Sequence, residues 1–174
     1  MTKSISAQGA TARRALMLNT PTDIDHDGRR KIADALNACL ADVFTLYIKT
    51  KNFHWHMSGP HFRDYHLMLD EQSDQIFAAS DPLAERVRKL GERTLHSIGQ
   101  IGKLSRLQDN DAPLVSAHDM LAELAADNGA MAASLREAHE MCEQFNDVAS
   151  ASLIENYIDE TERRVWFLFE ASRV

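Results

Sequence analysis

Apolar residues recur at steps of three and four along four long segments of the 174-residue chain, and this spacing is typical of amphipathic helices. With seven glycines and four prolines, the chain has few residues that would interrupt such helices. The pattern therefore predicts an all-α fold. The apolar stripes lie within about residues 25–57, 61–90, 114–142 and 147–168.

The links between these segments differ in length, and the difference selects one arrangement of the four helices. Ser58-Gly59-Pro60 and residues 144–146 are short links, which place the helices they join side by side and antiparallel. Residues 91–113 form a long link between the middle two helices, with room for a short helix over about 94–104. We therefore predict a ferritin-like four-helix bundle with a long crossover that carries a short helix.

Pro82 falls inside the second predicted helix and allows two interpretations. A proline in a helix interior removes a hydrogen bond and produces a kink. The interpretation we favour is one kinked helix over about residues 61–90. In the alternative, one helix ends near Ala79 and another begins with Ser80 as its cap and Pro82 in its first turn.

Composition divides the chain into two parts. Residues 1–22 contain Lys3, Arg13 and Arg14 but no acidic residue, and they are rich in Ser, Thr, Ala and Gly. We predict a flexible N-terminal tail over residues 1–22 and the bundle over residues 23–174. Since the whole chain has a net charge of -7, bulk charge does not favour binding of nucleic acid by the bundle.

The sequence also bears on compartment and redox state. No apolar run approaches the roughly 20 residues that span a bilayer, and no apolar signal segment follows the first charges, so a cytoplasmic protein without membrane contact is expected. Cys39 and Cys142 match no metal or redox spacing and lie on apolar stripes. We expect both to be buried, reduced thiols.

Histidine and acidic residues on the second helix form two pairs that point to a metal site. His66 and Asp70 are four residues apart, as are Asp81 and Glu85, so each pair shares a helix face. The eleven residues from Asp70 to Asp81 make nearly three turns, which places both pairs in one stripe away from the apolar stripe. At 1.5 Å per residue the two pairs are roughly 16 Å apart, so one helix cannot close the site.

Two copies of the chain can close it. In an antiparallel arrangement about a two-fold axis near residues 75 and 76, residue n faces residue 151 minus n of the partner subunit. His66 then faces Glu85 of the partner subunit, and Asp70 faces Asp81 of the partner subunit. His54, near the preceding turn, supplies a further nitrogen. Carboxylates and imidazoles suit iron(II) or a similar borderline cation, whereas the competing interpretation is a core histidine beside solvated acidic pairs.

Four motifs in this region match a known family. NFHW at 52–55, GPHF at 59–62, YHLMLD at 65–70 and DPLAER at 81–86 resemble the Dps proteins, the mini-ferritins of bacteria. The resemblance implies a dodecameric hollow shell with ferroxidase centres at two-fold interfaces and a ferric mineral core. It also implies that iron(II) is oxidised preferentially by hydrogen peroxide, which protects DNA from hydroxyl radicals. By position, the catalytic and metal-binding residues are His54, His66 and Asp70 of one subunit with Asp81 and Glu85 of its neighbour.

Several features keep alternatives open. Trp55 matches a tryptophan near the ferroxidase centre of the family, where its role is either packing or radical trapping. Pro82 departs from the family's sequence pattern and affects the direction in which Asp81 and Glu85 point. The cations of the tail either contact DNA phosphates or remain solvated without a partner. A row of acids on the third helix is either a solvated face or the lining of an iron pore: Asp119, Glu123 and Asp127.

Two other functions compete with the ferroxidase. One is a nucleoid-associated structural protein that compacts DNA and binds iron secondarily. The other is a helical bundle that uses the same stripe only as a dimer interface and holds no metal.

Overall fold

The computed structural model describes residue 9 and residues 18–173. Within that part of the chain every regular element is a helix and no strand occurs, which confirms the predicted all-α fold. The helices are α2 (His26–His56), α3 (Phe62–Ala78), α4 (Ser80–Lys89), α5 (Ile98–Leu104), α6 (Ala117–Gln144) and α7 (Val148–Ser172).

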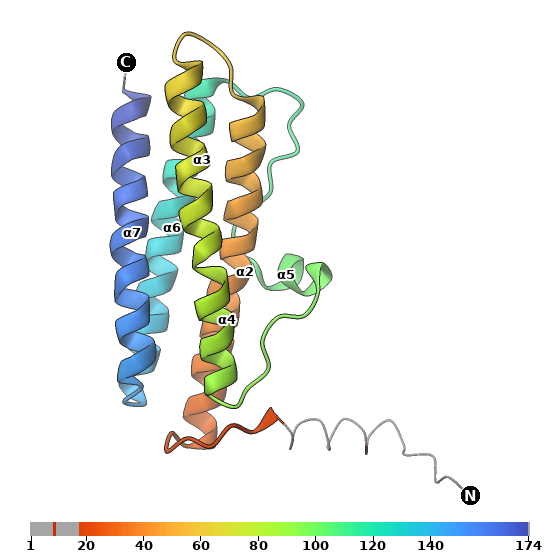
Figure 1. Ribbon diagram of the computed structural model, residues 1–174, viewed down its shortest axis with the longest axis vertical. Helices are drawn as coiled ribbons and strands as arrows, with labels where there is room; N and C mark the ends of the chain where they lie inside the picture. The colour runs from red at the N-terminus through yellow and green to blue at the C-terminus, as the bar shows by residue number, and fades with distance from the viewer. Residues whose placement is uncertain (1–8, 10–17, 174) are drawn as a thin grey trace, which may run out of the picture.

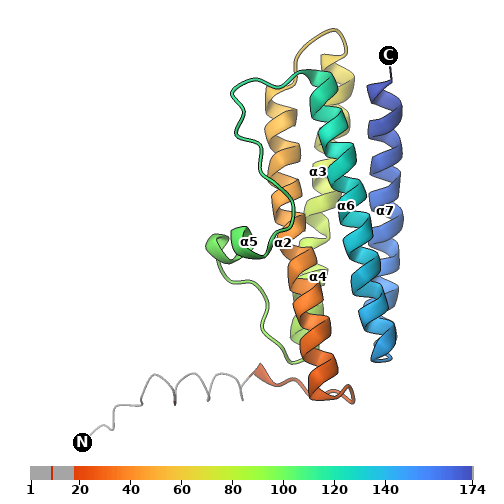
Figure 2. The same ribbon diagram turned by 180° about the vertical axis from the view of Figure 1, so that it is seen from behind.

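Four rods make up the bundle: α2, α3 continued by α4, α6 and α7 (Figure 1). The link after α4 runs back along α2 to the opposite end of the bundle, as both views show, and carries α5 outside the four rods (Figure 2). This long crossover makes α6 run in the same direction as α3 and α4. The connectivity is the ferritin-like one that the link lengths predict.

Side-chain caps fix where the long helices begin. Asp25 Oδ1 accepts from the Gly28 amide at 2.8 Å, and Ser116 Oγ accepts from the Asp119 amide at 3.1 Å. Asp147 Oδ1 accepts from the Ser150 amide at 3.0 Å and caps α7. Such caps contribute about 1 kcal/mol each.

The region around Pro82 contains two helices rather than the single kinked helix that we favoured. The helical pattern is interrupted at Ala79, and Pro82 lies in the first turn of α4, where its missing N–H costs little. Ser80 is the first residue of α4 rather than its cap, and its hydroxyl donates to the Phe77 carbonyl at 2.6 Å. Ala79 itself keeps right-handed helical dihedrals (φ -72°, ψ -17°), so α4 continues along the path of α3.

The core of the bundle contains two cysteines, and an ion pair ties the crossover to α2. Cys39 and Cys142 are fully buried free thiols, as predicted, and burial raises the pKa of Cys142 to about 12. Asp42 of α2 is fully buried and accepts from the amide and guanidinium of Arg106, at 2.6 Å from both the amide and Nη2. Among the described residues, no helix is both long and apolar enough to cross a membrane.

Candidate metal centre

Two histidines from neighbouring helices are locked face to face. His54 Nδ1 lies 2.8 Å from the His66 carbonyl oxygen, and His66 Nδ1 lies 2.9 Å from the His54 carbonyl oxygen. The rings stack with centroids 3.8 Å apart. A carbonyl only accepts, so each Nδ1 must carry a proton, which leaves Nε2 as the ring nitrogen that can bind a cation. Backbone carbonyls in this position fix the tautomer and aim of a metal-ligating histidine.

Asp70 completes the part of the site that one chain brings together. Its Oδ1 lies 3.6 Å from His54 Nε2, so a carboxylate and an imidazole nitrogen converge on one point. His54, His66 and Asp70 are therefore close together in a single chain, while their role as metal ligands stays a prediction. His54 is 8% exposed overall, while the Asp70 side chain is 46% exposed, so the grouping opens on the outer surface of the bundle.

A lysine that we did not predict also belongs to this grouping. Lys51 Nζ lies 2.5 Å from Asp70 Oδ1. The hydrogen bond from this ammonium group holds the pKa of Asp70 below its usual range, so the carboxylate is ionised and ready to bind a cation. The spacing offered a signal, because Lys51 lies one helical turn before His54 on α2.

Asp81 and Glu85 lie elsewhere on the same chain. Both are exposed on α4, and Glu85 is 3.2 Å from Lys89 one turn later. Across the part of the chain described, no three or more His, Cys, Asp or Glu residues are arranged to hold a metal ion. A single subunit thus presents two separate groups of ligands rather than one closed site, and the predicted pairing of residues that sum to 151 stays a prediction.

Large apolar side chains are exposed around these ligands. Phe77 is 50% exposed on α3, and Trp55 is 63% exposed at the end of α2. Trp55 is not packed in the core of its own subunit, and its role, packing or radical trapping, stays open. Exposed apolar residues next to incomplete ligand groups are typical of a surface that another subunit covers.

Two acids of the row on α6 contact a buried lysine, so the row is not simply the solvated face that was one of our two interpretations. Glu123 and Asp127 each lie 2.8 Å from Lys49, whose side chain on α2 is 3% exposed. Burial raises the pKa of Asp127 despite this lysine. Asp119 instead accepts from the hydroxyl of Ser116 at 2.6 Å. Two of the three acids neutralise a buried cation within the bundle, and the pore lining remains untested.

Comparison with known proteins agrees with the fold. The family model of the ferritin-like domain matches residues 33–171. A DNA protection during starvation protein from Halobacterium salinarum is 33% identical over 139 residues, covering 80% of this chain and 76% of that protein. An archaeal Dps homologue of known structure from the same organism is 30% identical with a TM-score of 0.83, covering 87% of this chain and 84% of that one. A Dps protein of known structure from Vibrio cholerae O1, a member of a broad superfamily of ferritin-like diiron-carboxylate proteins, is 25% identical with a TM-score of 0.83. The match covers 89% of this chain and 98% of that one.

The fold and the matched domain define a ferritin-like protein. Within that class, the identity to the starvation proteins and the likeness of the structures place the chain more narrowly. The chain belongs to the Dps family.

Proposed function

We propose that this protein is a Dps-type ferroxidase that oxidises iron(II) and stores the ferric product inside a dodecameric shell. The observation that carries the proposal is the stacked pair of histidines, each with Nδ1 bonded to a carbonyl, with His54 Nε2 beside the ionised Asp70. Iron(II) is the substrate of this site. Mixed nitrogen and carboxylate ligands with open positions suit it.

The second half of each site comes from another subunit in this proposal. His66 lies opposite Glu85 of the partner subunit, and Asp70 lies opposite Asp81 of the partner subunit. Two equivalent sites then form about one two-fold axis. The exposed Phe77 near the axis supports this contact, because an apolar ring on the ligand-bearing face gains from burial there.

The ligands of this chain provide charge, orientation and access for an oxidant. Three carboxylates from the two subunits neutralise iron(II) and stabilise iron(III) still more, which favours loss of an electron. Hydrogen peroxide accepts one electron from each of two iron(II) ions and two protons, and leaves as two waters. Because the peroxide takes up both electrons, no hydroxyl radical is released near DNA.

A variant with both His66→Ala and Asp70→Ala tests the ferroxidase. We expect loss of fast peroxide-dependent oxidation of iron(II), followed by absorbance of the ferric product, with the assembly intact on a sizing column. His56→Ala is the control, because His56 lies in the last turn of α2 like His54 but is exposed and bonds only the Asn52 carbonyl. Wild-type rates in the double variant would contradict the proposal.

A second function, DNA binding, is supported by a different observation. Residues 1–22 carry three cations and no acidic residue, while the chain as a whole has a net charge of -7. We propose that this tail contacts DNA phosphates in a sequence-independent, salt-sensitive way. A gel shift of the full chain and of a chain lacking residues 1–17, at low and moderate salt, tests it. Absence of a shift for the full chain at low salt would eliminate this function.

A further inference from the structure

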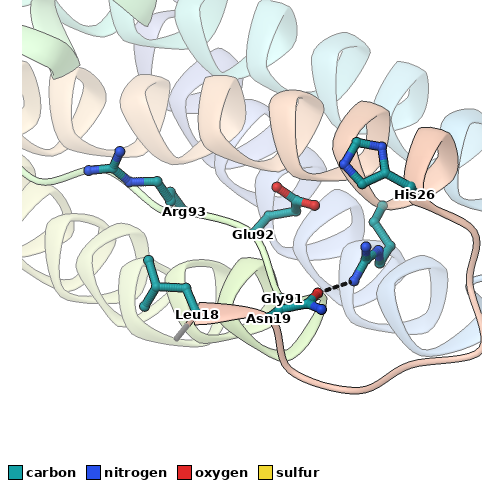
Figure 3. A pocket seen from close by; sticks show the side chains of 7 residues that line it. Leu18, Asn19, His26, Gly91, Glu92 and Arg93 are labelled. Carbon is teal, nitrogen blue, oxygen red and sulfur yellow. Dashed lines mark hydrogen bonds between the residues drawn. The ribbon is translucent and has the colours of Figure 1, made fainter. Parts of the chain in front are cut away.

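A cleft of about 290 Å³ lies at the end of the bundle where the N-terminal segment meets α2 and the loop after α4 (Figure 3). It is far along the bundle from the histidines of α2 and α3, since it adjoins the first turn of α2 rather than the last (Figure 1). Its lining residues are Leu18, Asn19, His26, Arg29, Gly91, Glu92 and Arg93.

Hydrogen bonds from side chains to backbone carbonyls tie together the segments that form this cleft. Arg88 Nη2 donates to the Leu18 carbonyl at 3.0 Å, and the same guanidinium donates to the Glu92 carbonyl on the opposite wall. Thr20 Oγ1 returns a bond to the Arg88 carbonyl at 3.0 Å. Gly91 has φ +80°, and a Cβ there would lie 3.0 Å from the backbone of Thr20, so only glycine allows this close approach. The cleft is thus a built feature of the fold.

Two arginines line the cleft without a carboxylate partner. Neither Arg29 nor Arg93 forms a salt bridge within the described part of the chain, whereas Arg30, Arg86 and Arg106 each do. Arg29 Nη1 donates to Asn19 Oδ1 at 2.8 Å, but its Nε is buried and has no hydrogen-bond partner among the described residues. Because neither guanidinium is ion-paired within the described part of the chain, both remain available to an anion that enters the cleft.

We propose that this cleft binds one phosphate of the DNA backbone at the root of the N-terminal tail. Two guanidinium groups and one carboxylate line it, which gives a net positive charge that matches a singly charged phosphodiester. A guanidinium presents parallel N–H donors in the geometry that phosphate oxygens accept. The segment that forms one wall continues directly into residues 1–17, which carry the three tail cations. The inference rests on the proposed DNA contact of the tail and gives it a fixed anchor on the folded bundle.

The test measures DNA affinity as a function of salt for the assembled full-length protein. Anisotropy of a labelled duplex is recorded between about 50 and 200 mM salt for wild type, Arg93→Gln, and Arg29→Gln with Arg93→Gln. We expect the slope of log K against log salt to become shallower by about 0.9 for each phosphate that the variant no longer neutralises. Arg30→Gln is the control, because it removes the same charge from the next residue, where Arg30 is exposed and already paired with Asp27. Equal slopes in the control and the double variant would overturn the proposal.

Arg93→Gln keeps the test valid if the double variant folds poorly, because the Arg93 side chain is exposed and holds no structural bond in the described part of the chain. Calorimetric titration with inorganic phosphate, against chloride at equal ionic strength, separates the cleft from the tail. If wild type fails to bind DNA, the proposed tail contact fails, while phosphate binding that is lost in the double variant still supports the cleft. Phosphate binding without any change in DNA affinity would overturn the assignment to DNA.

Discussion

Lys51 competes with metal for Asp70, and replacing it with methionine should tighten metal binding. The ammonium group lies 2.5 Å from Asp70 Oδ1, the oxygen that also lies nearest His54 Nε2. A cation that binds between these two atoms must displace the lysine from the carboxylate. Methionine has a similar length and no charge, so Lys51→Met removes the competitor and retains most of the packing of the stem.

The size of the effect follows from exposure. The Asp70 side chain is 46% exposed and that of Lys51 is 15% exposed, so water screens the pair and limits its strength to at most about 1 kcal/mol. This corresponds to about fivefold in affinity. If the ammonium stayed about 4 Å from a divalent ion in water, repulsion would add about 2 kcal/mol. The flexible lysine stem can turn into solvent instead, so we expect a gain of about five- to tenfold.

Calorimetric titration with cobalt(II) measures this affinity without oxidation of the metal. Lys31→Met is the matched control, because Lys31 is also on α2 and lies 2.7 Å from Asp27, remote from the histidines. Lys51→Arg retains the positive charge and should not tighten binding. Unchanged or weaker affinity in Lys51→Met would refute the idea that the lysine competes for Asp70.

Three further predictions concern single side chains. Burial lowers the pKa of Arg164 to about 10, and its Nε donates to Asn128 Oδ1 at 2.8 Å. Arg164→Met alone should lower the free energy of unfolding in urea by about 1–3 kcal/mol, because Asn128 Oδ1 is left unpaired, and adding Asn128→Leu should restore it; a double variant as unstable as the single one would contradict this. Cys142, with its pKa raised to about 12, should resist alkylation in the native protein at about pH 8, and rapid labelling of the native protein seen by mass spectrometry would count against this. Because this pKa exceeds the unfolded value of about 8.5, the contribution of the thiol to folding stability is full below about pH 8.5 and is lost as the pH rises above it. Pro82→Ala should change cobalt(II) affinity less than twofold, because Ala79 already keeps α4 in line with α3; a larger drop in affinity would show that the proline aims Asp81.

The parts of the fold that depend on neighbouring residues could be predicted from the sequence. Apolar periodicity indicated the four rods, and link length indicated the crossover, because both follow from helix geometry. Asp147 was identifiable as a cap, since capping needs only the next three residues. His54, His66 and Asp70 lie close together because a short link sets how α2 and α3 align, while their role as metal ligands stays a prediction.

Contacts between residues distant in sequence could not be predicted. Glu123 and Asp127 appeared solvated because a single apolar stripe implies one buried face. However, α6 packs against α2 as well as α7, and the acids lie on that second contact. Lys51 was overlooked for a related reason, since its partner Asp70 is on another helix. The boundary at Ala79 was the alternative that we did not favour, and the sequence alone does not decide it, because the dihedrals there remain helical while the hydrogen-bond pattern changes.

The separation of the ligands has a consequence for when the proposed chemistry can begin. His54 and His66 are held by each other's carbonyls across α2 and α3, so their aim is set once the bundle folds. Asp81 and Glu85 are on α4, roughly three turns away, and α4 keeps the direction of α3. A folded subunit therefore has both histidines and Asp70 in place but lacks the other two carboxylates that would stabilise iron(III). If the proposed pairing across the two-fold axis holds, oxidation starts only after subunits associate, so the ferric product forms where the shell can enclose it.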